Sequence, residues 1–222
     1  ATGNNNGSSW SNAYTDLQNA INNATGNDEI WIAEGLYTTN SSNGFVISHT
    51  KNGLKIFGGF SGDESSIAER DIASHRTVLS GDHDGDDITN ENGVTERSED
   101  IRGSNSLHVL NFDSSNPNNV IDGSTFIDGL TLTAGNARSN NFAIEDRSGG
   151  GVICNASTFG SRCSPTLSRI VFIGNDAEGP GSAIFAYGVT NSQGSSPTIL
   201  NSLITENGGS SSFPSVIRAS GQ

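Results

Sequence analysis

Two segments near the end of the sequence repeat each other. Residues 164–188 align without a gap with residues 196–220, at an offset of 32 that places Ile184 over Val216. A looser copy lies upstream, where GGGVI stands at the position that GSAIF and SVIR take later. Repetition at this period predicts a solenoid, because each coil buries its apolar side only by stacking on its neighbours. A sandwich has no reason to repeat in this way.

Short apolar runs and turn residues alternate along most of the chain. From Glu29 onward, runs such as EIWIA, LKIF, TVLS and LHVLNF are separated by Gly and Asn. The chain holds 28 glycines and only 32% hydrophobic residues, which suits many turns better than long helices. We therefore expect an all-β fold of many short strands.

A short amphipathic helix precedes these runs. Its apolar residues recur at helical spacing, and Thr15 is the expected N-cap, with Gln18 three residues on. We predict a helix over residues 15–24 within an N-terminal cap, residues 1–28, that shields apolar surface and a strand edge. Residues 29–222 then form the coils.

Asparagines recur where the repeats turn. Asn136, Asn175 and Asn207 follow the strand-like runs of the three copies. Asn readily adopts the left-handed backbone conformation, and equivalent turns stack on one another in a β-solenoid. We expect these three side-chain amides to form a structural ladder, hydrogen-bonded from coil to coil.

Net charge limits the partners of the chain. The net charge of −13 and the pI near 4.4 argue against nucleic acid or an anionic membrane surface, which bind through lysine and arginine. No run of about 18 apolar residues occurs, so we expect no membrane insertion by this segment.

The two cysteines bracket the polar segment NASTFGSR. Cys154 and Cys163 lie nine positions apart in a predicted turn, and a disulfide there would close a small loop. The acidic composition, the two lysines and the absence of methionine suit an extracellular protein. Two free thiols are the alternative, and a zinc site is not expected without neighbouring histidines.

An acidic excursion, residues 80–106, opens with the stretch LSGDHDGDD. The alternation of its first three aspartates matches the first ligand positions of DxDxD calcium loops. The match then ends, because the sixth position is Asp87 and the twelfth is Gly93, so the loop is not an EF-hand. A solvated acidic loop is the alternative. We predict a Ca²⁺ site with the ligands Asp82, Asp84, Asp86 and Asp87, completed by Asn90 or Glu91.

The other charged residues predict neither a metal site nor a catalytic site. The cluster SGDESSIAERD, with Asp63, Glu64, Glu69, Arg70 and Asp71, is interpreted as a turn held by local ion pairs and helix-end contacts. Enzymes that cleave polysaccharides need a base or grouped carboxylates. The conceivable bases form no concentrated arrangement in the sequence, so we assign no catalytic residue. They are Lys55, Arg70, Arg76 and His108.

Several segments together resemble a known family. GSSWSNAYTDLQNAI, DEIWIAEGLYT, LKIFGGFSGDESSIAERD, TVLSGDHDGDD and NVIDGSTFIDGLTLTAGNA are similar to the N-terminal part of bacterial right-handed parallel β-helix surface proteins. FIGN, GGGV and GSAI resemble the repeat motifs of polymorphic outer-membrane proteins, although LITEN and PSVI depart from that pattern. The resemblance implies a right-handed parallel β-helix behind a capping helix, secreted or at the cell surface, and it implies no particular chemistry.

The resemblance and the residues together define the expected function. We expect a structural, adhesive or glycan-binding module, stabilised by calcium, with glycans or surface proteins as partners. The last coil carries no capping element, which predicts a longer polypeptide or self-association through that open C-terminal coil. Two alternatives stay open. One is a lyase or glycoside hydrolase acting on acidic polysaccharide, and the other is a self-assembling filament or layer subunit.

Overall fold

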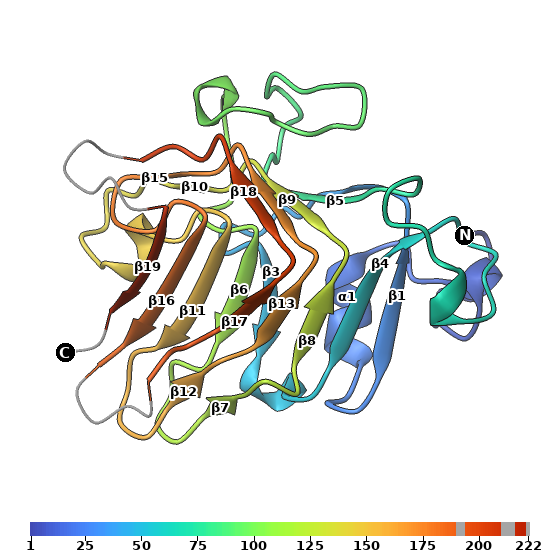
Figure 1. The fold of residues 1–222 in the computed structure, drawn as a ribbon, viewed down its shortest axis with the longest axis horizontal. Coiled ribbons are helices and arrows are strands. Elements are labelled where there is room, and N and C mark those ends of the chain that lie inside the picture. The colour runs from blue at the N-terminus through green and yellow to red at the C-terminus, as the bar shows by residue number, and fades with distance from the viewer. Residues whose placement is uncertain (190–193, 210–215, 221–222) are drawn as a thin grey trace.

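Parallel β-sheets stacked along one axis form the body of the protein (Figure 1). The structure, a computed structural model, describes residues 1–189, 194–209 and 216–220. Within these ranges the chain runs through three five-stranded sheets in turn, adding one strand to each before it returns to the first. We call one such passage a rung, and the described residues contain five rungs.

Every sheet has the same strand order along the stack, and no sheet closes on itself. Sheet A comprises β1 (Glu29–Ala33), β4 (Lys55–Phe60), β8 (Phe126–Asp128), β13 (Thr166–Ser168) and β17 (Thr198–Leu200). Sheet B comprises β2 (Gly35–Tyr37), β5 (Thr77–Ser80), β9 (Thr131–Thr133), β14 (Val171–Ile173) and β18 (Leu203–Thr205). Sheet C comprises β3 (Phe45–Ser48), β6 (Leu110–Asp113), β11 (Val152–Ala156), β16 (Ile184–Gly188) and β19 (Ile217–Ser220).

Short elements complete the rungs. Two parallel pairs lie at the corners: β7 (Val120–Ile121) with β12 (Arg162–Cys163), and β10 (Asn136–Ala137) with β15 (Asp176–Ala177). The one α-helix of the described residues is α1 (Leu17–Asn23), and none of their helices is long and apolar enough to cross a membrane. The 3-10 segments are η1 (Trp10–Asn12), η2 (His49–Lys51), η3 (Ile67–Glu69), η4 (Ser98–Asp100) and η5 (Glu145–Arg147).

Equivalent apolar residues stack to form the core. In sheet A, a column of aliphatic side chains runs through all five rungs in direct register. Its three central members are at most 2% exposed, and burying such a side chain contributes about 1.5–3 kcal/mol. The column consists of Ile30, Ile56, Ile127, Leu167 and Ile199. The stack is therefore held together by contacts between neighbouring rungs, as in a solenoid.

The register agrees with the sequence repeat in two sheets and departs from it in the third. Thr166 pairs with Thr198 at the expected offset, whereas Ile184 pairs with Ile217 and not with Val216. The second copy therefore holds one additional residue between Asn207 and Ile217. Residues 210–215 of the aligned segment lie outside the described residues.

Residues in the left-handed conformation recur at two corners of the rungs. Gly129, Arg169 and Asn201 occupy one corner, between sheets A and B, with φ of 76°, 52° and 49°. At the other corner, after the strands of sheet B, Ala134, Gly174 and Glu206 have φ of 63°, 64° and 52°. A positive φ turns the chain sharply, and the corners of these three rungs stay aligned because the equivalent residue of each adopts it.

Helix α1 covers the N-terminal edge of sheet C. It begins at Leu17, later than predicted, because Asp16 and not Thr15 is the N-cap, its side chain accepting the Asn19 N–H at 2.6 Å. The Gln18 side chain donates to the carbonyl of Val46 on β3 at 3.0 Å and accepts the Val46 N–H at 2.8 Å. A side-chain amide thus takes the place of a neighbouring strand on β3.

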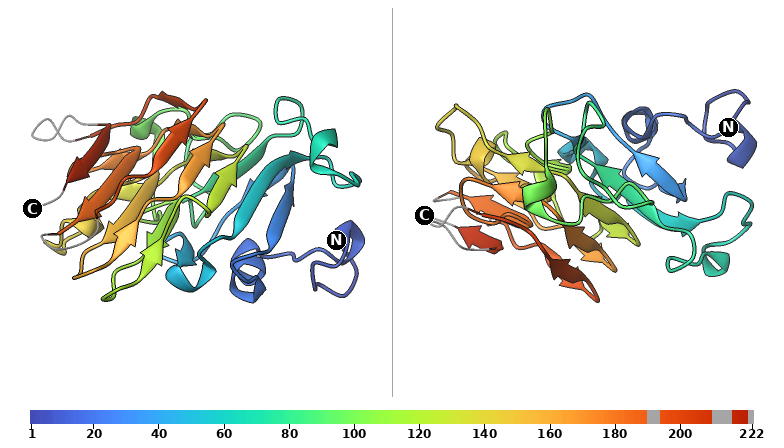
Figure 2. Two further views of the ribbon diagram at one scale, coloured as in Figure 1. Left: turned by 60° about the horizontal axis from the view of Figure 1, so that its bottom comes forward. Right: turned by 90° about the horizontal axis from the view of Figure 1, so that it is seen from above.

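The C-terminal rung leaves apolar side chains exposed. Leu200 on β17, Leu203 on β18 and Ile217 on β19 are 43%, 56% and 48% exposed. These strands are edge strands, each with a neighbour on one side only. Figure 2 shows this rung and the N-terminal segment at opposite ends of the stack.

Candidate functional site

The acidic excursion between β5 and β6 projects from the body of the stack (Figure 1, green loop above the sheets). Its two ends are joined by an antiparallel bridge between Asp82 and Asn105 and by the His83 N–H, which donates to the Ser104 carbonyl at 3.0 Å. A second bridge, between Thr89 and Thr95, closes a turn within the loop. The loop is therefore built on its own backbone contacts, with both ends fixed to the stack.

Three carboxylates converge where this loop begins. One oxygen from each of Asp82, Asp84 and Asp86 lies within 4.8 Å of the others. Asp82 is buried and accepts the Gly85 N–H at 2.8 Å, whereas Asp84 and Asp86 are exposed. Gly103 faces the two exposed carboxylates so closely that a Cβ there would lie 2.5 Å from Asp86 Oδ2. The alternation read from the sequence thus brings three of the five predicted ligands together.

The surroundings of Asp86 perturb its titration. Partial desolvation, and next the charge of Asp84, raise the pKa of Asp86, while Arg102 opposes the shift. A carboxyl whose pKa is raised in this way is strained in its charged form. Hard cations such as Ca²⁺ prefer oxygen ligands and would relieve this strain.

The other two predicted ligands have different partners. Asp87 Oδ1 accepts the Arg102 N–H at 2.6 Å, and its Oδ2 accepts from Thr95 and Asn105 at 3.1 Å. Burial raises the pKa of Asp87, and the Arg102 N–H partly compensates. The side chain of Asp87 therefore holds the two arms of the loop together, apart from the three converging carboxylates.

Asn90 is committed to the Thr89–Thr95 turn. Its Oδ1 accepts the N–H groups of Asn92 at 2.9 Å and Val94 at 3.2 Å, and its Nδ2 donates to Glu96 at 2.9 Å. An oxygen that already accepts two backbone hydrogen bonds is a poor metal ligand. Asn90 therefore closes a local turn and does not complete the aspartate cluster.

The second acidic cluster folds a surface segment. Glu64 accepts the N–H groups of Ser61 and Gly62 at 2.6 and 3.0 Å. Desolvation would raise the pKa of Glu64, but these hydrogen bonds outweigh it and hold the pKa at about 2. Glu69 and Asp71 likewise accept from neighbouring serines. The cluster folds into turns, but hydrogen bonds from backbone N–H groups and serines take the place of the predicted local ion pairs, because Arg70 pairs with Asp128 outside the cluster.

The four conceivable bases lie apart, each in its own surroundings. Arg70 pairs with the buried Asp128, and Lys55 forms an exposed ion pair with Glu29 at 3.2 Å. His108 is buried and bonds the Gly149 carbonyl at 2.9 Å, and desolvation lowers its pKa to about 4. Arg76 lines a separate cleft with Glu34 and Glu91.

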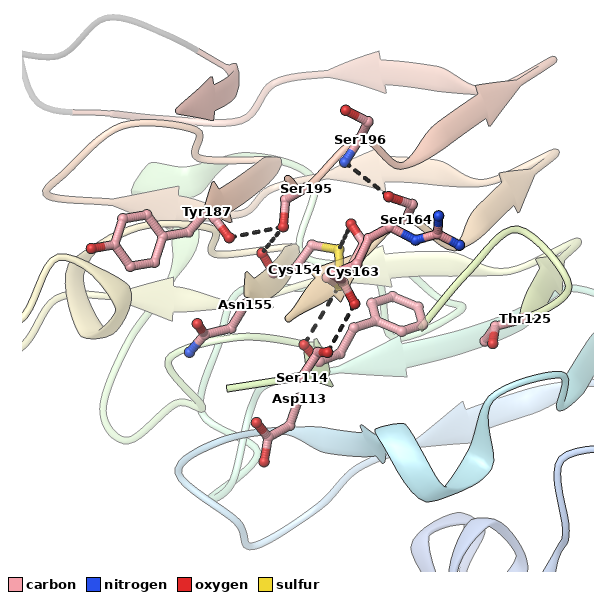
Figure 3. The surroundings of a disulfide bond; sticks show 12 residues. Asp113, Ser114, Thr125, Cys154, Asn155, Cys163, Ser164, Tyr187, Ser195 and Ser196 are labelled. Carbon is pink, nitrogen blue, oxygen red and sulfur yellow. Dashed lines mark hydrogen bonds between the residues drawn. A yellow bond between two sulfur atoms is a disulfide. The ribbon is translucent and has the colours of Figure 1, made fainter. Parts of the chain in front are cut away.

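Cys154 and Cys163 form a disulfide inside the stack (Figure 3). It joins the middle of β11 to β12 within one rung, and both residues are fully buried. In the next rung, the Ser195 hydroxyl donates to the Tyr187 carbonyl at 2.8 Å and to the Cys154 carbonyl at 3.3 Å. The disulfide fixes the corner between sheets C and A. At the same corner of the next rung, the hydrogen bond from Ser195 to the Cys154 carbonyl connects the chain to the rung that holds the disulfide.

The asparagine ladder has two members and not three. Asn175 Nδ2 donates to Asn207 Oδ1 at 2.9 Å, and Asn175 Oδ1 accepts the Gly135 N–H at 3.0 Å. Asn136 pairs in register with Asp176, so it lies one residue beyond the ladder position, which Gly135 occupies. A side chain at Gly135 would meet the Gly150 carbonyl at 1.8 Å. Asn175 and Asn207 themselves are not left-handed, because the residue before each one, Gly174 or Glu206, makes the turn.

Sequence reasoning missed an aromatic cleft at the N-terminal end. Trp31 stacks on Phe60 with 4.9 Å between ring centroids, and Trp10 lies across both rings. These tryptophans line a cleft of about 980 Å³ between the N-terminal segment, α1 and β1. Its residues come from distant segments, and the only signal in the sequence was that both tryptophans fall within the first 31 residues.

Comparison with known proteins identifies no relative of the chain. The chain matches no protein-family model, no curated protein and no solved structure.

Proposed function

We propose that the chain is a calcium-stabilised, right-handed parallel β-helix module of an extracellular or cell-surface protein, with a structural, adhesive or glycan-binding role. The parallel stack with its repeating rungs supports the architecture. The buried disulfide and the acidic composition support an oxidising, extracellular environment. The observation that carries the calcium part of the proposal is the convergence of three carboxylates on one point.

Each aspartate has a distinct part in the proposed site. Asp82 is held by the N–H groups of Gly85 and Asp87 and supplies a fixed oxygen. Asp84 and Asp86 are exposed and supply oxygens from the loop surface, where water completes the 6–8 ligands that Ca²⁺ takes. Binding would replace repulsion within the cluster by attraction to one cation, and so stabilise the loop on the stack.

Titration with Ca²⁺ tests this site. We expect saturable heat in calorimetry and a rise in melting temperature with Ca²⁺ concentration, because a ligand that binds only the folded state stabilises it by mass action. Asp84→Asn and Asp86→Asn each remove a charged ligand and should weaken binding by at least about tenfold, equivalent to about 1.4 kcal/mol.

Glu91→Gln is the matched control. It removes one carboxylate from the same loop. Glu91 is the predicted alternative to Asn90 for completing the site, but it lines the separate cleft with Glu34 and Arg76, in the segment that the Thr89–Thr95 bridge closes. Calcium affinity should change by less than about threefold in this variant, since long-range charge effects are screened by salt. Absence of binding to the unaltered chain, or equal losses in Glu91→Gln and Asp84→Asn, would contradict the proposed site.

A further inference from the structure

Strand β1 presents an unpaired edge at the bottom of the aromatic cleft. It is the first strand of sheet A and pairs only with β4. The Asp28 carbonyl accepts the Lys55 N–H at 3.1 Å, with Glu29 in register with Lys55. Because hydrogen bonding alternates along a strand, the N–H and C=O groups of Glu29 and Trp31 face away from β4. Among the described residues, no backbone hydrogen bond joins the N-terminal segment or α1 to these groups.

The cleft runs along this edge and not over one face of the sheet. All five residues of β1, Glu29–Ala33, line it consecutively, although their side chains alternate between the core and the exterior. Helix α1 forms one wall with Leu17 and Ala20, and the N-terminal segment forms another with Trp10 and Tyr14. A groove of this shape matches a single extended chain of about five residues, roughly 17 Å long.

The charge of the cleft, and the cover that α1 forms over β3, limit which kind of molecule can occupy the cleft. Asp28, Glu29 and Glu64 line the cleft, and no described lysine or arginine side chain does. Lys55, outside the cleft, pairs with Glu29 at 3.2 Å, so the carboxylates of Asp28 and Glu64 supply the negative charge that no described ion pair offsets. The cleft therefore favours a cationic occupant. A complete rung of a second copy does not fit, because α1 and its Gln18 side chain already occupy the matching edge of β3. Sheet C therefore cannot take a further strand at this end while this side chain is in place, whereas the outer edge of β1 in sheet A is unpaired.

We propose that the cleft binds an extended, cationic peptide segment of another protein as an added strand on the outer edge of β1. Backbone hydrogen bonds to Glu29 and Trp31 supply the affinity, as in other cases of strand addition. Alternate side chains of the peptide then face two different walls. One set meets the aliphatic wall at Ala20 and Ile30, and the other meets the rings of Trp10 and Trp31. The peptide is therefore expected to carry apolar residues at alternate positions and lysine or arginine at its ends.

The tryptophans provide the readout. The chain contains two, and both line the cleft, so its fluorescence reports directly on occupancy. The probe is a seven-residue peptide of alternating valine and threonine with a lysine at each end, acetylated and amidated. We expect a saturable change in tryptophan emission. The same peptide with alternate backbone nitrogens methylated should bind at least about tenfold more weakly, because two hydrogen bonds are lost.

Two substitutions at one position separate the backbone from the side chain. Glu29→Pro removes an outward N–H without removing a bond to β4, and should weaken binding at least about tenfold. Glu29→Gln keeps that N–H and should weaken binding by less than about threefold. Circular dichroism checks that both variants are folded. If Glu29→Pro does not fold, the methylated peptide still tests the backbone hydrogen bonds, because it is measured with the unaltered chain.

Several results would overturn the proposal. They are no saturable change in emission at millimolar peptide, equal binding of the methylated peptide, or displacement of the peptide by a neutral oligosaccharide such as cellohexaose or chitohexaose. The last result would assign the aromatic rings to sugar stacking. None of these measurements involves the aspartate loop, so their outcome is independent of the calcium titration.

Discussion

Asn175 connects three rungs through a single side chain. Its Nδ2 donates to the Leu132 carbonyl at 3.0 Å in one neighbouring rung and to Asn207 Oδ1 at 2.9 Å in the other, while its Oδ1 accepts the Gly135 N–H. The residue is fully buried, so without its side chain the Gly135 N–H and the Leu132 carbonyl lose this partner, whereas Asn207 Oδ1 still accepts the Asn175 N–H at 3.1 Å. An unpaired buried polar group costs about 1–3 kcal/mol.

We predict that Asn175→Ala lowers the free energy of unfolding by about 2–4 kcal/mol, because it leaves the Gly135 N–H and the Leu132 carbonyl without their side-chain partner. Asn207→Ala, at the more exposed end of the ladder, should cost about half as much. Urea denaturation of the two variants beside the parent chain measures both losses. Equal losses, or a larger loss at Asn207, would show that the ladder does not depend on its buried member.

At the scale of elements, a buried carboxylate ties three segments together. Asp128 on β8 accepts two hydrogen bonds from Arg169, at 2.9 and 2.6 Å, and a further one from Arg70. Arg70 comes from the excursion between β4 and β5, and its guanidinium lies over the Phe57 ring at 5.0 Å. Burial alone would raise the pKa of Asp128, but hydrogen bonds from the arginines lower it. The excursion is thereby fixed to sheet A.

Asp128→Ala is expected to cost about 3–5 kcal/mol, because it leaves the buried Arg70 without its partner. Arg169→Ala should cost about 1–2 kcal/mol, since that side chain is 49% exposed and water replaces it.

The contribution of Asp128 to stability is expected to depend on pH. Because its pKa is lowered in the folded state, the contribution is present above the ordinary aspartate range and is lost as pH falls through the folded-state pKa. The difference between parent and Asp128→Ala in urea denaturation should therefore shrink below about pH 4. A pH-independent difference would contradict the ionic origin of the effect.

The sequence was informative about the elements to the extent that they repeat. Because each rung stacks on an equivalent rung, the alignment of Thr166 with Thr198 directly predicted their pairing. The alignment failed where a rung has a different length, as at Ile217 and at Asn136, because a single added residue shifts every later side chain.

Prediction from the sequence also failed where tertiary contacts decide the structure. Nothing in the sequence revealed that the oxygens of Asp87 and Asn90 are used within the loop. The Trp10–Trp31 cleft depends on the path of the N-terminal segment, which follows no repeat.

At the scale of the whole molecule, stability is expected to vary along the stack. A solenoid is stabilised by contacts between adjacent rungs, so a terminal rung with one neighbour is the least stable. The central strands β8 and β13 have neighbours on both sides, and their core residues are fully buried. Strands β17 and β18 have a neighbour on one side, and Leu200 and Leu203 are exposed.

Hydrogen exchange followed by mass spectrometry measures this gradient. We expect amides of β8 and β13 to exchange at least about tenfold more slowly than those of β17 and β18, because local opening of the last rung costs less free energy. Protection should decrease again only slightly at β3, whose edge Gln18 covers. Uniform protection from β4 to β18 would indicate instead that the stack opens in a single cooperative step.

The Gln18 side chain, which is hydrogen-bonded to β3, makes the two ends of sheet C different. At the N-terminal end of sheet C, an amide that cannot be extended into a further strand uses the N–H and C=O of Val46. In the last rung, the side chains of Ser202 and Asn207 donate to the carbonyls of Leu200 and Thr205, and among the described residues no side chain there takes both the N–H and the C=O of one strand residue. A further strand could join sheet C at the N-terminal end only if both of the Gln18 hydrogen bonds were broken first. One glutamine side chain therefore acts as a lock on that end of the sheet.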